Sequence, residues 1–348
     1  MDTQNALSQE VPSPDILMGM LFQSASFPMI KLPILRAGVE LQVWANIANG
    51  HRTAEAIASA MGAEPGGVRR LLDALTVMRL LEKEAHHYYV PAWAEYYLLP
   101  GKPTYLGDFV LDWLAWEGHG QLAEAIRTGK RPIGADCTRA ESVGHFIPYY
   151  TIRALAPRRF LKRYDGYWQA LHVEPRQGLQ VLDLACGAGI ATLALAIQHA
   201  GIHVVLQDWP AMLDLALHAA RTLGVDQLVT TLPGDMFSVD YGQERFDIAR
   251  LGFVTYFFAA EDLAKLFRKV HACLSAGGMV VVEAPLCDEG HCELEEEVLD
   301  GPWLYAVSSR GDIYSFSDYK GLLEQAGFCS VIQVRGDLVK ATRQGAVP

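Results

Sequence analysis

The stretch 181-VLDLACGAGIATLALA-196 indicates the fold of the second half of the chain. Residues 179–184 form a short, mainly apolar run that is typical of a buried parallel strand. A turn containing Gly187 and Gly189 follows, and apolar residues then recur at helical spacing from residue 190 to 197. The two glycines allow the backbone to approach a ligand closely, and the helix N-terminus presents free N–H groups to it. The order strand, glycine turn, helix therefore predicts a nucleotide-binding loop.

The residues downstream alternate between predicted strands and helices. A strand at 202–206 is followed by Asp208, which stands 19 residues after Gly189. This is the spacing expected of an acidic residue that binds a ribose diol. Further strands are predicted around 228–232, at 246–253 and at 278–284, with helices at 211–223 and 261–274. We therefore expect a doubly wound α/β domain whose ligand lies at the carboxyl ends of the strands.

Two classes of nucleotide cofactor suit such a domain. The dinucleotide fingerprint requires a third glycine three residues after Gly189, where this sequence has Thr192. The run 183-DLACGAG-189 instead resembles the glycine motif of class I methyltransferases, and 234-GDMF-237 resembles their adenine-side motif. These motifs favour S-adenosylmethionine as the cofactor.

Residues from about 38 to 342 resemble the bacterial and plant small-molecule methyltransferases that carry an N-terminal winged-helix dimerisation domain. The resemblance implies a mainly α-helical winged-helix domain at 1–100, a helical connector at 101–172 that lines the substrate pocket, and a Rossmann-like methyltransferase domain at 173–348. It also implies the residues that bind S-adenosylmethionine: Asp183, Ala185, Gly187, Gly189, Asp208, Trp209, Gly234, Asp235, Met236, Phe237 and Arg250.

The N-terminal part fits this resemblance. Thr53 is a suitable N-cap for a helix that ends at Gly62, a second helix is predicted over 68–78, and wing strands are predicted around 80–90. The preceding stretch 18–44 is unusually apolar and is divided by Pro28 and Pro33, so it predicts two or more short helices. An apolar surface of this size favours a homodimer, in which the family wraps such helices around its partner.

The connector is predicted to form helices at 105–131 and 146–168 around a loop at 132–144. Aromatic side chains on these helices could pack in the core or form a pocket wall for a flat acceptor, and the sequence leaves both open. The segment that contains Trp303, Arg310 and Tyr314 stands where the family places its substrate-facing helix and loop. Together the two segments supply the candidate substrate-binding residues: Trp113, Trp116, His119, Tyr149, Tyr150, Trp303, Arg310 and Tyr314.

The catalytic residues of the resembled O-methyltransferases are incomplete. Their general base is a histidine after the fourth strand, but residues 253–258 read FVTYFF, which leaves Thr255 or Tyr256 at that place. Glu283 matches the first family carboxylate and is our third catalytic candidate, although it could instead form a salt bridge with Arg250. No glutamate matches the second carboxylate, and Asp312 is out of register. A tyrosine in place of the histidine resembles the bacteriochlorophyll ring methyltransferase, a carbon methylase.

Other histidines and cysteines carry weaker signals. His119 and His145 are alternative bases. Cys287, His291 and Cys292 have no standard metal-ligand spacing, so no metal is expected.

Composition limits the partners. The chain has 348 residues and a formal net charge of −11, which argues against nucleic acid as a partner. Six scattered cysteines without a CxxC pair favour a reducing compartment. We recognise neither a signal peptide nor an apolar run of the ~18 residues that a membrane span requires, so a cytoplasmic protein without a membrane partner is expected.

Three functions remain open from the sequence. The first is methyl transfer to a carbon, nitrogen or oxygen of a small, aromatic or polyketide-like metabolite. The second is a methyltransferase fold repurposed for cyclisation, decarboxylation or hydroxylation, with the cofactor in a structural or electrostatic role. The third is a non-catalytic binding protein. The intact glycine loop favours the first, while the missing histidine supports the second.

Overall fold

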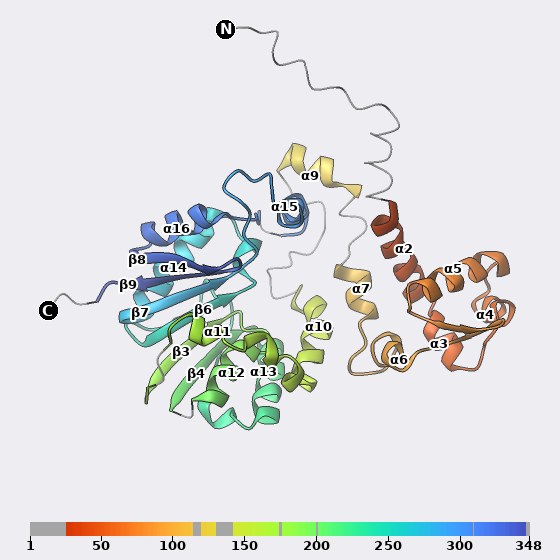
Figure 1. Cartoon of the computed structure of the whole chain (residues 1–348), viewed down its shortest axis with the longest axis horizontal. Helices are drawn as coiled ribbons and strands as arrows, with labels where there is room; N and C mark the ends of the chain where they lie inside the picture. The colour runs from red at the N-terminus through yellow and green to blue at the C-terminus, as the bar shows by residue number, and fades with distance from the viewer. Residues whose placement is uncertain are drawn as a thin grey trace, which may run out of the picture. The chain divides into compact units, whose positions relative to one another are not determined.

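The computed structural model describes residues 26–113, 120–129, 142–173, 176–199, 201–308 and 310–345. The chain divides into two compact units, Met1–Leu114 and Ala115–Pro348, and each is described by itself (Figure 1).

The first unit is mainly helical, as predicted. Its elements are α2 (Ser26–Glu40), α3 (Val43–Ala48), α4 (Ala54–Met61), α5 (Pro65–Val77), β1 (Glu82–Glu84), β2 (His87–Tyr89), α6 (Ala92–Leu98) and α7 (Gly107–Trp113). Thr53 caps α4, because its Oγ1 accepts a hydrogen bond from the Ala56 N–H at 3.2 Å. Trp44, Ile57 and Leu72 are fully buried where the helices meet.

Pro33 does not divide the apolar N-terminal segment as predicted. It lies inside α2, which continues to Glu40. A proline in a helix interior costs ~3 kcal/mol, but α2 packs against both α5 and α7, and this burial favours the continuous helix. Pro28 lies in the first turn, where its missing N–H has no intrahelical partner to lose.

The second unit is built on a seven-stranded sheet in the order β5-β4-β3-β6-β7-β9-β8. Its strands are β3 (Leu179–Leu184), β4 (Ile202–Asp208), β5 (Val229–Pro233), β6 (Phe246–Gly252), β7 (Leu274–Glu283), β8 (Phe328–Arg335) and β9 (Leu338–Arg343). Neighbouring strands from β5 to β7 are parallel, whereas β9 is antiparallel to both β7 and β8. The five predicted strands are confirmed, and the hairpin β8–β9 was not predicted.

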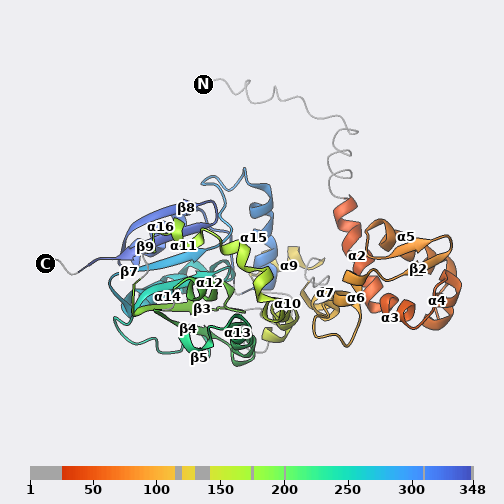
Figure 2. The same ribbon diagram turned by 60° about the horizontal axis from the view of Figure 1, so that its bottom comes forward.

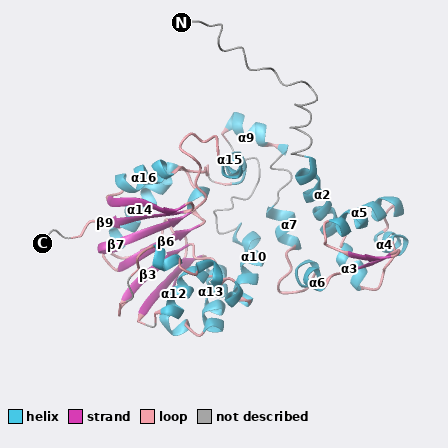
Figure 3. Ribbon diagram, viewed as in Figure 1, coloured by secondary structure: helices cyan, strands magenta, loops and turns pink. Residues whose placement is uncertain are grey.

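Helices cover both faces of this sheet (Figure 3). α12 (Ile190–Gln198) packs against α13 (Pro210–Leu223), while α14 (Ala260–Cys273) packs against α16 (Phe316–Gln325). The chain leaves β3 towards β4 but later returns to β6 on the other side of β3. Because parallel crossovers are right-handed, these two directions place the two helix pairs on opposite faces. The point where the direction reverses is the usual ligand site of such a sheet.

The connector contains shorter helices than predicted. α9 (Leu122–Thr128) and α10 (Val143–Leu155) are followed by the 3₁₀ turns η2 (Pro157–Arg159) and η3 (Leu161–Tyr164) and by α11 (Tyr167–Ala170). The predicted helix 146–168 breaks before Pro157, which lacks an N–H, and Ala156 has left the helical conformation, with φ −131° and ψ 52°. α9 lies beside α15 (Glu295–Val307), as Figures 1 and 2 show.

None of the helices in these described ranges combines the length and the apolar character that crossing a membrane requires.

Candidate cofactor site

A pocket opens at the carboxyl ends of β3, β4, β5 and β6. It encloses about 730 Å³, a volume that includes its open mouth. Its walls come from α10, the glycine turn, the ends of β4 and β5, and the turn after β6. The lining residues are Val143, Phe146, Tyr150, Ala185, Gly187, Gln207, Asp208, Trp209, Met212, Gly234, Asp235, Met236, Gly252, Phe253, Val254, Phe257 and Phe258.

The glycine turn forms the floor of this pocket. Gly187 has φ +57°, and a Cβ at this position would overlap the ring of Tyr150 on α10. Ala185 also has positive φ, at +48°, a conformation that costs energy for a residue with a side chain. Gly189 does not line the pocket, but it is the N-cap of α12 and turns the chain into that helix. The glycine at position 187 thus allows the Tyr150 ring to pack directly against the backbone of the turn.

Asp208 is the charged group of the pocket. Its side chain is 9% exposed, and its two carboxylate oxygens accept hydrogen bonds from the N–H groups of Gly187, at 2.8 Å, and Trp209, at 2.7 Å. Burial raises the pKa of this carboxyl to about 6, although both N–H groups oppose the shift. A carboxylate at this depth in the pocket is suited to accept hydrogen bonds from a ribose diol.

We expect the affinity for S-adenosylhomocysteine to fall by up to about tenfold between pH 7.5 and pH 5. The Asp208 carboxyl is ionised above its pKa of about 6, and only the ionised form accepts hydrogen bonds from both ribose hydroxyls. Calorimetric titration at the two pH values measures the change. Asp208→Asn should remove the pH dependence and weaken binding about tenfold at pH 7.5, whereas Asp226→Asn, at the surface, should change neither.

Gln207 is a pocket residue that the sequence reasoning missed. Its Nε2 donates to the Gly234 carbonyl at 2.6 Å, and its Oε1 accepts from the Ala185 N–H at 3.3 Å. It therefore ties the glycine turn to the end of β5. The only sequence signal for this role was its place next to Asp208. Met212 and the α10 residues Val143 and Phe146 were missed as well.

The adenine-side residues divide between two roles. Gly234, Asp235 and Met236 line the pocket, as does Trp209. The Asp235 carboxylate also holds its own turn, because it accepts from the Phe237 N–H at 3.0 Å. Phe237 is not among the lining residues, and its ring instead meets the edge of Phe258 at a centroid distance of 4.9 Å.

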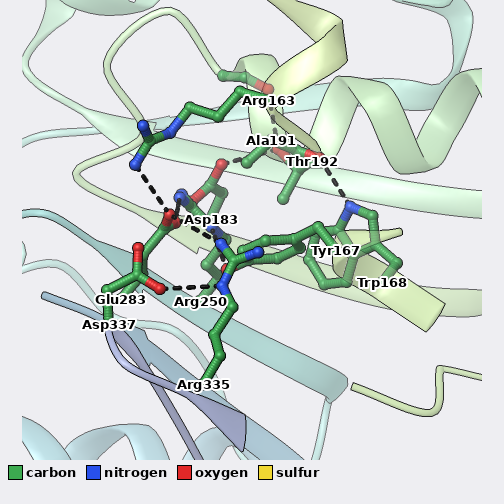
Figure 4. Close-up of polar contacts among 11 residues, drawn as sticks. Arg163, Tyr167, Trp168, Asp183, Ala191, Thr192, Arg250, Glu283, Arg335 and Asp337 are labelled. Atoms are coloured by element: carbon green, nitrogen blue, oxygen red, sulfur yellow. Dashed lines mark hydrogen bonds and ion pairs between the residues drawn. The ribbon is translucent and has the colours of Figure 1, made fainter. Parts of the chain in front are cut away.

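Three predicted site residues form a buried ion network below the pocket (Figure 4). Arg250 donates to Asp183 at 3.0 Å and to Glu283 at 2.6 Å, and it also donates to the Tyr167 hydroxyl at 3.2 Å. The second Asp183 oxygen accepts from Thr192 Oγ1 at 2.7 Å. None of the three lines the pocket. Their contacts hold β3, β6 and β7 together, and the salt bridge between Glu283 and Arg250, which the sequence left as an alternative, is present. Direct cofactor binding by Asp183 and Arg250 and catalysis by Glu283 stay predictions.

The structure separates the two candidates at the missing-histidine position. Thr255 is fully buried, its hydroxyl lies 2.6 Å from the hydroxyl of Tyr319 on α16, and it is not among the lining residues of the pocket. Tyr256 is partly exposed in the 3₁₀ turn η5 (Thr255–Phe257), and its ring packs on Phe257 at 4.5 Å. Tyr256 is not among the lining residues of the pocket, whereas Phe257 and Phe258 are.

The predicted substrate residues are dispersed. The ring of Tyr150, on α10, packs against Gly187 of the glycine turn. Tyr149 is 37% exposed, and its hydroxyl accepts a hydrogen bond from Arg153. Tyr314 is buried and donates to the Phe258 carbonyl at 2.8 Å, so it supports the turn after β6. Arg310 lines a second cavity. Trp116 and His119 lie outside the described residues, as do the side chains of Trp113, Trp303 and His145.

Comparison with known proteins agrees with this geometry. Residues 181–278 match the family described as "Methyltransferase domain", and residues 25–99 match the "O-methyltransferase dimerisation domain". The tetracenomycin polyketide synthesis 8-O-methyl transferase TcmO of Streptomyces glaucescens is 25% identical over 307 residues, which cover 85% of this chain and 87% of that protein. The N,N-dimethyltransferase OxyT of Streptomyces rimosus is 26% identical over 317 residues, with coverage of 84% and 86%.

Solved structures share the fold. The structure of PigF with SAH (S-adenosylhomocysteine) has a TM-score of 0.74 at 18% sequence identity, and the match covers 96% of this chain and 100% of that one. PigF itself is described as an S-adenosyl-L-methionine-dependent methyl transferase from Serratia sp.. The chain thus carries a methyltransferase domain and an O-methyltransferase dimerisation domain.

Proposed function

We propose that the protein methylates a small aromatic or polyketide-like metabolite. The observation that carries this proposal is the pocket at the glycine turn, which a buried carboxylate, Asp208, lines beside Gly187 and the Tyr150 ring. TcmO is named as an O-methyl transferase of tetracenomycin polyketide synthesis, and OxyT is named as an N,N-dimethyltransferase. The name of TcmO supports a polyketide-like acceptor, and the two names together support either oxygen or nitrogen as the methylated atom.

The residues present fit the cofactor. Asp208 would hold the ribose hydroxyls, Met236 and Trp209 would flank the adenine, and Gly187 would lie under the methionine part. Arg153 would bind the methionine carboxylate, because it follows the pocket residue Tyr150 by about one turn of α10. Its Nη1 is buried and has no hydrogen-bond partner among the described residues. When bound, the cofactor supplies an electrophilic methyl group on a sulfonium.

The chain's contribution to the reaction is then mainly positioning. An in-line displacement gains much of its rate when the acceptor atom is held close to the methyl group. Phe253, Phe257 and Phe258 line the pocket and exclude water from it. Tyr256 lies in the turn η5, directly before Phe257, and its hydroxyl would orient the acceptor. Because residues 253–258 contain no histidine, acceptors that react without a strong base are favoured.

A homodimer is part of the proposal. The chain carries a dimerisation domain at 25–99. Within that region the apolar side chains of Val77, Trp93 and Tyr96 are 84%, 48% and 44% exposed, which favours their burial against a second copy. Light scattering at micromolar concentration should give a dimer mass, and a monomer mass would contradict this part.

The function is tested by mass spectrometry of candidate acceptors, together with two matched variants. Tyr256→Phe should lower kcat and kcat/KM by about 10²-fold without changing affinity for S-adenosylhomocysteine, since a hydrogen bond made mainly in the transition state is lost. Thr255→Val should leave kcat unchanged but destabilise the protein by about 1–3 kcal/mol, because the buried Tyr319 hydroxyl loses its partner.

The outcomes separate the functions that the sequence left open. A product that gains one methyl group, with stoichiometric S-adenosylhomocysteine, supports methyl transfer. Conversion of the acceptor without that gain would instead show a repurposed fold. An unchanged kcat in Tyr256→Phe would remove this residue from the reaction.

A further inference from the structure

The turn at residues 234–238, here called the adenine-side turn, forms one wall of the cofactor pocket. Three of its residues, Gly234, Asp235 and Met236, line the pocket. The turn closes with a hydrogen bond from the Ser238 N–H to the Asp235 carbonyl at 2.9 Å. Among the described residues, no N–H group of the turn donates to the next two carbonyls along the chain. The donors for these carbonyls must therefore come from another part of the fold.

Lys269 on α14 supplies these hydrogen bonds. Its Nζ donates to the Met236 carbonyl at 3.0 Å and to the Phe237 carbonyl at 2.9 Å. The Met236 carbonyl also accepts from the Tyr241 hydroxyl, and the ammonium lies 4.3 Å from the centroid of that ring. Hydrogen bonds from a charged donor are stronger than those between neutral groups. One side chain thus fixes two successive carbonyl groups of the adenine-side turn.

The environment of Lys269 differs from that of a surface lysine. Lys269 is half-buried, and burial lowers the pKa of its ammonium, although the nearby carboxylates of Asp235 and Asp240 oppose the shift. Lys265, one turn earlier on the same helix, is 65% exposed and pairs with Asp262 at 2.8 Å. A lysine is rarely withdrawn from water without a specific partner. The partner of Lys269 is the backbone of the adenine-side turn.

Lys269 can affect a ligand only through this turn. It is not among the residues that line the pocket, whereas Met236, whose carbonyl it binds, is one of them. The other side of the turn is held independently, because Gln207 donates to the Gly234 carbonyl. Loss of the Lys269 ammonium would therefore free the Met236 end of the turn and leave the Gly234 end in place.

We propose that Lys269 is a positioning residue for the cofactor, which holds the adenine-side turn in the shape that binds the adenosyl group. The inference rests on the proposed function, in which Met236 and Trp209 flank the adenine. A wall that is fixed before the ligand arrives saves the cost of ordering it during binding. Without the ammonium, the two carbonyls would turn towards water, and Met236 would lose its place in the wall.

Replacing Lys269 by methionine is expected to weaken binding of both S-adenosylhomocysteine and methylthioadenosine about tenfold. Methylthioadenosine has the adenosyl group but no amino-acid part, so an equal loss for the two ligands assigns the effect to the adenosyl side. Methionine keeps much of the apolar stem of the lysine. Lys269→Arg should recover most of the affinity, because a guanidinium can also donate to two carbonyls. Calorimetric titration of the full-length protein measures these affinities.

Two matched variants serve as controls. Lys265→Met removes a positive charge from the same helix and should change neither affinity. Arg153→Met should weaken S-adenosylhomocysteine alone, because methylthioadenosine lacks the carboxylate that Arg153 would bind. Thermal unfolding measures the stability of each variant separately. If Lys269 contributed only to stability, Lys269→Met would have a lower Tm, but the folded protein would bind both ligands as the wild type does.

Tyr241→Phe is the second variant, and it provides the test if Lys269→Met does not fold. It removes the other donor to the Met236 carbonyl and should weaken both ligands about threefold. Wild-type affinities in the folded Lys269→Met protein, or in Tyr241→Phe if that is the variant used, overturn the inference. A loss for S-adenosylhomocysteine that methylthioadenosine does not share overturns it as well. If the wild-type protein binds neither ligand, the proposed function itself is wrong.

Discussion

Replacing Arg250 by methionine is expected to lower the free energy of unfolding by about 3–5 kcal/mol. Arg250 is 4% exposed and lies between Asp183 and Glu283, both of which are fully buried. Methionine keeps much of the apolar stem but leaves Asp183 without an ion pair and Glu283 with only its longer contacts to Arg163, at 3.5 Å, and Arg335, at 3.9 Å. The cost of an uncompensated buried charge is much larger than the value of an exposed ion pair.

Urea denaturation followed by circular dichroism measures this change. Arg176→Met is the matched control, because the Arg176 side chain is 60% exposed and its ion pair with Asp247 lies at the surface. The control should lose no more than about 1 kcal/mol. Adding Asp183→Asn and Glu283→Gln to Arg250→Met should recover part of the loss, since the unpaired charges are then removed. A loss below about 1 kcal/mol in Arg250→Met alone would contradict the structural role of the network.

The network also shows why its role could be predicted only in part from the sequence, which offered the Glu283–Arg250 salt bridge as an alternative but did not add Asp183 to it. Asp183 precedes the glycine turn and Glu283 ends an apolar strand, so both matched functional positions of the resembled family. Their contacts depend on the order of the strands, in which β6 lies between β3 and β7. Arg250 is 67 residues from Asp183 and 33 from Glu283 in the chain. No local pattern states that three such distant residues become neighbours.

The cofactor pocket was more predictable, because most of its signals are local. Strand β3, the turn at Gly187 and helix α12 follow one another directly, and Asp208 ends the next strand. Hydrophobic periodicity and glycine spacing are sufficient for such a unit. The contribution of α10 was not predictable in the same way. Tyr150 reaches Gly187 only through the packing of the connector on the sheet.

The turn after β6 shows that the sequence could not decide between two neighbouring residues. The sequence left Thr255 and Tyr256 as alternatives, since a shift of the alignment by one residue changes which of them stands at the position of the family histidine. The chain forms a 3₁₀ turn there, and the hydroxyl of Thr255 meets that of Tyr319, a contact across 64 residues. Only the packing of α16 on the turn identifies which of the two side chains is buried.

Replacing Gly187 by alanine is expected to weaken binding of S-adenosylhomocysteine about 100-fold. Two effects act together. Gly187 has φ +57°, a conformation that costs a residue with a side chain about 1–3 kcal/mol. The new methyl group would also overlap the Tyr150 ring, and relief of that overlap moves either the ring or the turn into the cofactor's space. A factor of 100 corresponds to about 2.7 kcal/mol, which lies within the sum of these two costs.

Gly224→Ala is the control that separates strain from collision. Gly224 ends α13 with φ +75°, and a Cβ there would have no heavy atom within 4 Å. This variant should therefore lose stability but keep its affinity for S-adenosylhomocysteine. Adding Tyr150→Leu to Gly187→Ala should restore part of the affinity if the ring is the obstacle. Calorimetry on the four proteins, wild type included, gives the comparison, and wild-type affinity in Gly187→Ala would mean that the cofactor does not lie over this glycine.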